Sequence, residues 1–288
     1  MKLGVITDGI SQDFEHALKV MNEFELEYAE LQFLWDKEVG DLDADERKRA
    51  LALVKDYGVK VSSISRHVFG SIPMSTQPGD ELHTRHMDGL QRCIDMAHQF
   101  DCKTVRIMSG KKEMILWGRN GAEKWNVARG AWDSLLRIVD PAIRLAEKED
   151  VMLIVETGNG NMINSAWTAR KLIDDLGTDR LKVLWDPANA CFCHEPMWPD
   201  GYEALKGGYL GHVHIKDVQV DTPKATLEVR EMCKGQLADQ FQPAADAMRA
   251  DGYDGVISLE AVYHPGNGDF EEGFRACIGK FKAIFGNH

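Results

Sequence analysis

The sequence lacks several features that would assign it to a class at once. It has no G-x-G-x-x-G loop after its first apolar segment and no G-x-x-x-x-G-K-[S/T] phosphate loop, so neither motif supports a nucleotide-binding fold. It has no apolar run long enough to span a bilayer and no secretory pattern at its start, which predicts a cytoplasmic protein. Its six cysteines include no C-x-x-C pair, and we expect them to be free thiols.

Positive charge is also scarce. The 288 residues carry 46 acids against 34 bases, a formal charge of −12. This balance argues against a surface that binds nucleic acid or anionic lipid, because both partners require an excess of lysine and arginine. We therefore expect a small-molecule ligand, and neither nucleic acid nor a membrane as a partner.

The chain does contain a regular alternation of short apolar segments and amphipathic segments. Segments rich in β-branched residues predict strands at 3–7, 28–33, 60–65, 104–110, 151–157, 181–187, 210–217 and 255–261. Apolar residues at spacings of three and four predict helices at 13–24, 43–58, 81–100, 122–150, 165–177, 241–252 and 269–285. Pro141 is expected to kink or restart the fourth of these helices.

This alternation favours an α/β fold, a single (β/α)8 TIM barrel in one domain over residues 1–288. A doubly wound sheet is the alternative architecture. We expect the active site at the carboxyl ends of the strands, where barrel enzymes place it.

Acidic and imidazole side chains gather at the ends of the last four predicted strands. They are Glu156, Asp186, His214 and Glu260. Carboxylates brought this close repel one another unless a cation or protons neutralise them. Three carboxylates with one imidazole suit Mn²⁺, Mg²⁺, Co²⁺ or Fe²⁺, with Zn²⁺ less favoured. The alternative is that each acid is a separate cap or ion-pair partner.

The segments that carry these residues resemble the xylose-isomerase-like TIM barrels, which include sugar isomerases and 3-epimerases, inosose dehydratases and the more distant endonuclease IV. The resemblance covers nearly the whole chain. It lies in LGVITDG (3–9), AELQ (29–32), VET (155–157), VLWDPANA (183–190), GHVHIKD (211–217) and GYDGVISLE (252–260).

The resemblance implies one divalent metal ion, with Mn²⁺ expected, bound by Glu156, Asp186, His214 and Glu260. It also implies that Glu156 and Glu260 are catalytic, moving a proton from one face of a substrate carbon to the other through an enediolate. The expected enzyme is an isomerase or epimerase of a ketose or keto-sugar derivative, and a homo-oligomer, either a dimer or a tetramer.

Two other activities remain open. Asn189 stands where many epimerases of this kind have a histidine, and an amide cannot shuttle a proton near neutral pH. The alternative is therefore a metal-dependent dehydratase, decarboxylase or lyase of an oxidised sugar or inositol derivative. DNA repair of the endonuclease IV kind is a remote alternative, because the chain is acidic and offers a single set of four ligands.

Further residues near the predicted strand ends are candidates for supporting roles. His212 is expected one layer below His214, where it supports a ligand. Arg106 is expected to pair with Glu30 inside the barrel. Trp117 and Trp185 are candidates for a sugar platform or a subunit contact. The candidates for substrate binding are Asn189, His67, Lys216, Arg230 and His194.

Overall fold

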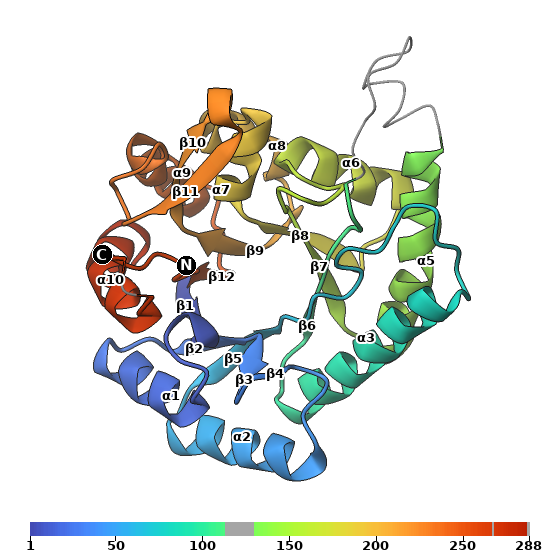
Figure 1. Cartoon of the computed structure of the whole chain (residues 1–288), viewed down its shortest axis with the longest axis horizontal. Coiled ribbons are helices and arrows are strands. Elements are labelled where there is room, and N and C mark those ends of the chain that lie inside the picture. The colour runs from blue at the N-terminus through green and yellow to red at the C-terminus, as the bar shows by residue number, and fades with distance from the viewer. Residues whose placement is uncertain (113–129, 267, 287–288) are drawn as a thin grey trace.

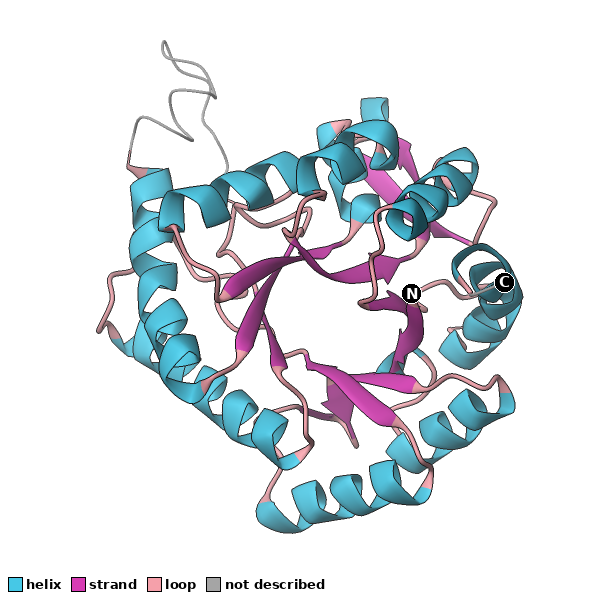
Figure 2. Ribbon diagram, turned by 180° about the vertical axis from the view of Figure 1, so that it is seen from behind, coloured by secondary structure: helices cyan, strands magenta, loops and turns pink. Residues whose placement is uncertain are grey.

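Eight parallel strands close into a barrel, and helices form a ring around it (Figures 1 and 2). The structure is a computed structural model that describes residues 1–112, 130–266 and 268–286. Neighbouring strands follow the order β1-β12-β9-β8-β7-β6-β5-β2, and β2 pairs with β1 to complete the circle. These strands are β1 (Lys2–Ile6), β2 (Tyr28–Leu31), β5 (Lys60–Ile64), β6 (Thr104–Ile107), β7 (Met152–Glu156), β8 (Leu181–Trp185), β9 (Leu210–Ile215) and β12 (Val256–Leu259). The predicted (β/α)8 barrel is confirmed.

The helices of the outer ring begin and end close to where the sequence pattern placed them. They are α1 (Phe14–Glu23), α2 (Ala44–Asp56), α3 (Glu81–Gln99), α5 (Ala131–Glu149), α6 (Ala166–Leu176), α9 (Ala238–Ala250) and α10 (Phe270–Phe285). The short α7 (Pro187–Ala190) and α8 (Tyr202–Leu205) were not predicted. Asp43 and Glu46 form a capping box that starts α2, so two otherwise unpaired backbone donors are satisfied there.

Two sequence predictions concern α5 and its approach. The helix continues across Pro141, so the expected restart does not occur. The first part of the predicted helix, 122–129, and Trp117 lie outside the described residues.

Two antiparallel hairpins were not predicted. The first joins β3 (Phe33–Leu34) to β4 (Lys37–Glu38), directly after β2. The second joins β10 (Asp217–Asp221) to β11 (Thr226–Arg230), directly after β9. Both lie at the carboxyl end of the barrel, so they build the rim of the region where an active site is expected.

Apolar side chains fill the space between the barrel and the helices. Trp185 is completely buried in this core, so its predicted role as a sugar platform or subunit contact is wrong. All six cysteines are free, as predicted. None of the helices in the described parts of the chain combines the length and apolarity needed to cross a bilayer.

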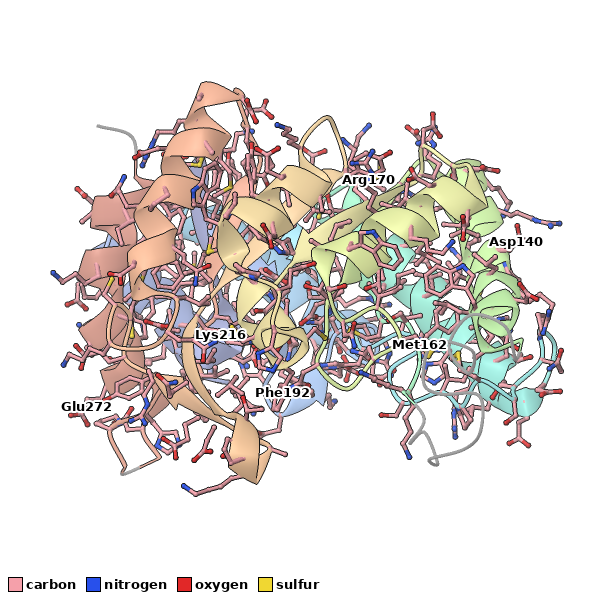
Figure 3. The ribbon with its side chains drawn as sticks, turned by 90° about the horizontal axis from the view of Figure 1, so that it is seen from above. Asp140, Met162, Arg170, Phe192, Lys216 and Glu272 are labelled. Atoms are coloured by element: carbon pink, nitrogen blue, oxygen red, sulfur yellow. The ribbon has the colours of Figure 1, made fainter. Side chains whose placement is uncertain are left out.

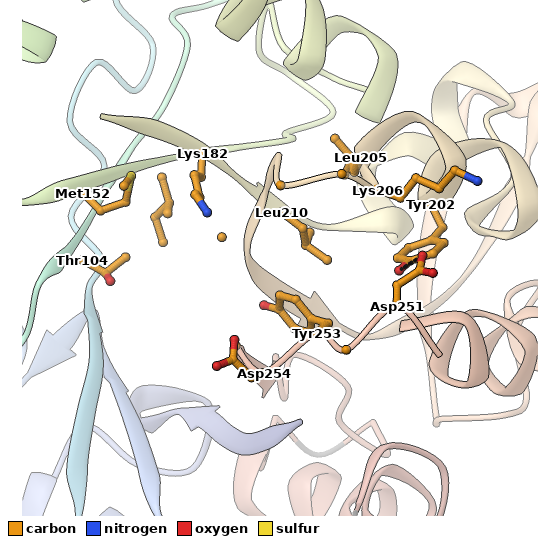
Figure 4. Close-up of a pocket in the computed structure, with 16 residues that line it drawn as sticks. Thr104, Met152, Lys182, Tyr202, Leu205, Lys206, Leu210, Asp251, Tyr253 and Asp254 are labelled. Atoms are coloured by element: carbon orange, nitrogen blue, oxygen red, sulfur yellow. Dashed lines mark hydrogen bonds between the residues drawn. The ribbon is translucent and has the colours of Figure 1, made fainter. Parts of the chain in front are cut away.

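A cavity of about 390 Å³ opens at the amino-terminal end of the barrel (Figure 4). Residues from several strand starts line it, including Thr104, Met152, Lys182, Tyr253 and Asp254. This end of a barrel contributes to stability rather than catalysis in enzymes of this architecture. The chemistry-bearing residues lie at the other end.

Candidate metal centre

Four predicted ligands come from adjacent strands at the carboxyl end of the barrel. Glu156 is the last residue of β7, Asp186 follows β8, His214 lies in β9 and Glu260 follows β12. One donor atom each of Glu156, Asp186 and His214 lies within 4.8 Å of the others, and all three side chains are buried. Glu260 completes the group, because its Oε2 is 3.5 Å from Nδ1 of His214.

His214 is oriented as a metal ligand requires. Its Nε2 donates to Glu30, 3.0 Å from Oε1 and 3.1 Å from Oε2. Its Nδ1 is buried and makes no hydrogen bond with the residues that the structure describes, although Oε1 of Glu156 is 4.0 Å away and Oε2 of Glu260 is 3.5 Å away. A buried polar atom without a partner costs about 1–3 kcal/mol. A cation between this nitrogen and the carboxylates would satisfy both, so the residues fit a metal ion.

The electrostatics of His214 also favour a cation at this position. Burial opposes protonation of the imidazole, but Glu30, Glu260 and Glu156 together raise its pKa to about 10. The surrounding carboxylates therefore create a strongly negative potential at the ring. A divalent ion would take the place of the Nδ1 proton in that potential.

Glu30 is the residue that holds His214, and the sequence analysis missed this role. The carboxylate is completely buried and accepts from Ser65 Oγ at 2.5 Å and from Nε2 of His212 at 2.8 Å. Burial raises its pKa, but the two histidines outweigh burial and hold the pKa well below its usual range. Metal-ligating histidines commonly donate their other N–H to a carboxylate in this way.

His212 contacts the same carboxylate as His214. Its Nε2 is 2.8 Å from Glu30 Oε2 and 2.9 Å from Ser258 Oγ. Glu30, His212 and His214 could also hold an ion between them. Both oxygens of Glu30 already accept hydrogen bonds, so we interpret Glu30 and His212 as supports for His214.

Asp186 is fixed by the start of the short helix α7. Its Oδ1 accepts from the backbone N–H groups of Ala188 and Asn189, at 3.0 and 3.2 Å. Pro187 follows it at the first helical position, where proline is favoured. Burial, with Glu260 and Glu156 nearby, raises the pKa of Asp186 to about 7 although Lys216 lowers it. The carboxylate cluster is therefore short of positive charge.

Lys216 supplies part of that charge. Its Nζ lies 2.5 Å from Oδ2 of Asp186 and 2.6 Å from Oε2 of Glu260. The side chain is 9% exposed. Figure 3 views the barrel from its side, and Lys216 lies there toward the end from which β10 and β11 project. The ammonium thus contacts two of the four proposed ligands, and no anchoring of a substrate anion is needed to explain its position.

Arg106 differs from its prediction. It does not pair with Glu30; its Nη1 donates to Glu156 Oε2 at 3.0 Å and to Gln32 Oε1 at 3.1 Å. Its remaining donors reach the backbone oxygens of Ser65 and Arg66. Arg106 therefore fixes one oxygen of Glu156 and leaves the other facing His214.

The remaining predicted substrate contacts lie around this centre with other partners. Asn189 donates from Nδ2 to Asp186 Oδ2 at 2.7 Å. His67 is exposed, and its Nδ1 is 2.7 Å from Glu38 Oε1. Arg230 pairs with Glu228 on β11. His194 is exposed in a left-handed turn after α7. Their contacts with substrate stay predictions.

Comparisons with known proteins agree with the barrel fold. A family model described as xylose isomerase-like TIM barrel matches residues 18–279. No curated protein matches the sequence. Among solved structures, the chain resembles D-psicose 3-epimerase in the presence of D-fructose, with TM-score 0.72, 15% identity and 100% of both chains covered.

Two further solved structures have the same fold. The IOLI protein with a bound zinc atom gives TM-score 0.75 at 15% identity, over 99% of this chain and 98% of that one. The probable 3-DHS dehydratase AsbF from Bacillus anthracis gives TM-score 0.69 at 14% identity, over 96% and 98%. At such identities these likenesses concern the fold.

Proposed function

The chain belongs to the xylose isomerase-like TIM barrel family, and from that premise we propose that it is a divalent-metal-dependent isomerase or epimerase of a ketose or keto-sugar derivative. The observation that carries the proposal is Nδ1 of His214, a buried nitrogen without a hydrogen-bond partner beside Glu156, Asp186 and Glu260. Mn²⁺ is the ion we expect, because oxygen donors dominate the set.

The ligands have separate tasks in this proposal. A divalent ion held by Glu156, Asp186, His214 and Glu260 would polarise the substrate carbonyl and stabilise negative charge on its oxygen. Glu30 fixes the ring of His214, and the start of α7 fixes Asp186. Preorganised groups of this kind need little rearrangement as charge develops in the reaction.

Glu156 and Glu260 are the proposed proton carriers. They flank Nδ1 of His214 from two different strands, with oxygens 4.0 and 3.5 Å from it. Burial raises the pKa of Glu260, but Lys216 and His214 outweigh burial and hold the pKa below its usual range. An ionised Glu260 would take a proton from the carbon beside the carbonyl, and Glu156 would return one to the other face.

Turnover in D2O tests this proposal. The Mn²⁺-loaded protein is incubated with a panel of ketopentoses and ketohexoses, and mass spectrometry measures deuterium in the product. We expect deuterium at the reacting carbon with no loss of water or carbon dioxide. Glu260→Gln should lower turnover by at least about 10²-fold, because a positioned acid or base contributes about that much or more.

The matched control is Glu203→Gln, which changes an exposed glutamate paired with Lys206. It should turn over at the wild-type rate. Near-normal activity of Glu260→Gln, with circular dichroism showing an intact fold, would refute the two-glutamate mechanism.

A dehydratase or other lyase is the second candidate. Elimination needs an acid that protonates the departing hydroxyl. The Lys216 ammonium lies 2.6 Å from Glu260, although Asp186 and Glu260 outweigh burial and raise its pKa, which weakens it as an acid. One of the structures with this fold is described as a probable dehydratase. The same D2O experiment separates the two activities, since elimination would show a net loss of water.

A further inference from the structure

A cavity of about 360 Å³ opens beside Glu260, between the ends of β1, β2 and β12. Its size is at the small end of the range for ligand pockets, about 300–1,000 Å³, which suits one monosaccharide. Its polar lining comes from Asp8, Ser11, Gln12, Gln32, Glu260 and Asp269, and its apolar lining includes Ile10, Val262 and Phe270.

Two of these side chains are fixed in place with hydrogen-bonding capacity to spare. The backbone N–H of Phe33 donates to Oδ1 of Asp8 at 3.2 Å. Arg106 donates to Oε1 of Gln32 at 3.1 Å, which leaves the amide N–H groups of Gln32 as donors. A carboxylate offers about four acceptor positions, so Asp8 can still accept a further hydrogen bond. An acceptor and a donor therefore line the same small cavity, an arrangement that matches a hydroxyl group.

Acids outnumber bases around the cavity. Asp8 and Asp269 line it together with Glu260, whose charge Lys216 offsets at 2.6 Å, and the described lining residues include no lysine or arginine. Arg106, which contacts Gln32, donates its other N–H groups to Glu156 and to backbone oxygens. An anion entering here would lose its water of solvation and meet carboxylates instead of cations, and both effects are unfavourable.

We propose that this cavity binds the uncharged, hydroxylated end of the substrate, with Asp8 and Gln32 as specificity-determining residues, so that the substrate is an unphosphorylated keto sugar. The inference rests on the proposed function, since it names the substrate class of that site. Exposed Phe270 adds an apolar wall, which suits the C–H face of a sugar.

The test compares matched substrates on the Mn²⁺-loaded protein. Each unphosphorylated ketose is assayed beside its terminal phosphate ester, and kcat/KM is measured for both. We expect the unphosphorylated sugar to be preferred by at least about 10²-fold, because leaving buried polar groups badly matched costs several kcal/mol. Asp8→Asn should raise KM for the unphosphorylated sugar more than it lowers kcat, and should reduce the preference over the ester about tenfold.

The control is Asp254→Asn, which changes an acid in the cavity at the opposite end of the barrel (Figure 4). It should change neither KM and kcat for the unphosphorylated sugar nor the preference for that sugar over its phosphate ester. A wild-type preference for the phosphate ester would overturn the inference, as would a preference unchanged in Asp8→Asn.

Failure of the proposed function has a different signature, namely no turnover and no deuterium exchange with any sugar. In that event calorimetric binding of five- and six-carbon alditols and their phosphates still decides the inference. Tighter binding of the alditols that weakens in Asp8→Asn supports it. Tighter binding of the phosphates contradicts it.

Discussion

Replacing Lys216 with methionine should tighten metal binding. The ammonium lies 2.5 Å from Asp186 Oδ2 and 2.6 Å from Glu260 Oε2, and both carboxylates are proposed metal ligands. A metal ion that takes these oxygens must share them with Lys216 or displace it. Methionine keeps an unbranched apolar side chain and removes the competing cation.

The size of the effect follows from the two ion-paired hydrogen bonds. Hydrogen bonds to charged groups contribute about 1.5–3 kcal/mol each. If metal entry weakens only one of them, Lys216→Met should lower the metal Kd at least about tenfold, which corresponds to about 1.4 kcal/mol. Without metal, the variant should be less stable by about 3–5 kcal/mol, because it leaves buried carboxylates unpaired.

Isothermal titration of Mn²⁺ into chelator-treated protein measures the Kd, and thermal unfolding with and without Mn²⁺ measures the stability. Lys234→Met is the control, since Lys234 is exposed and pairs with Glu231 away from the proposed ligands. It should leave the Kd unchanged. Equal or weaker Mn²⁺ binding by Lys216→Met would refute the competition between lysine and metal.

The first three of four further predictions concern the same centre. Mn²⁺ affinity should rise with pH up to about 10, because the folded pKa of His214 is raised to about 10 and the Nδ1 proton must leave first. Titration in buffers of different ionisation enthalpy measures the released proton. Protonated His214 should stabilise the metal-free protein. This stabilisation is fully present below the unfolded pKa of about 6.5 and is lost as pH rises through the folded pKa of about 10. Chemical unfolding at a series of pH values across that range would show the loss. Glu30→Gln should weaken Mn²⁺ binding about 10–100-fold, since it removes the carboxylate that orients His214, and unchanged affinity would contradict that role. Light scattering should show a dimer or tetramer, as the sequence resemblance implies.

The sequence pattern was sufficient for the barrel and for bringing three of the four proposed ligands together. Strand and helix periodicities come from nearest neighbours along the chain, so the eight barrel strands were found within a few residues. Because parallel strands end on one face, Glu156, Asp186 and His214 could be placed together before any contact was known.

Partners inside the barrel could not be predicted in the same way. Arg106 was expected to reach Glu30, yet it reaches Glu156. Several strands point side chains into one small interior, and the choice of partner depends on strand stagger and tilt, which periodicity does not encode. Glu30 was visible as an acid in a barrel strand, but only the register that brings it to His214 revealed its role.

The two hairpins had a weak local signal. In the second, Val218 and Val220 alternate with polar residues on one strand, and Leu227 and Val229 do so on the other, with Pro223 in the turn between them. That alternation is typical of a hairpin with one covered face. This signal was too weak to predict the hairpin, because a short hairpin buries little and its pattern resembles that of irregular polar sequence.

The most direct test of the account is a crystal structure of the Mn²⁺-loaded protein with anomalous scattering from manganese. We expect one anomalous peak within about 2.3 Å of His214 Nδ1, a normal bonding distance for such a ligand, and in contact with Glu156, Asp186 and Glu260. A crystal without a peak there, or with its peak between Glu30 and His212, would contradict the proposed centre.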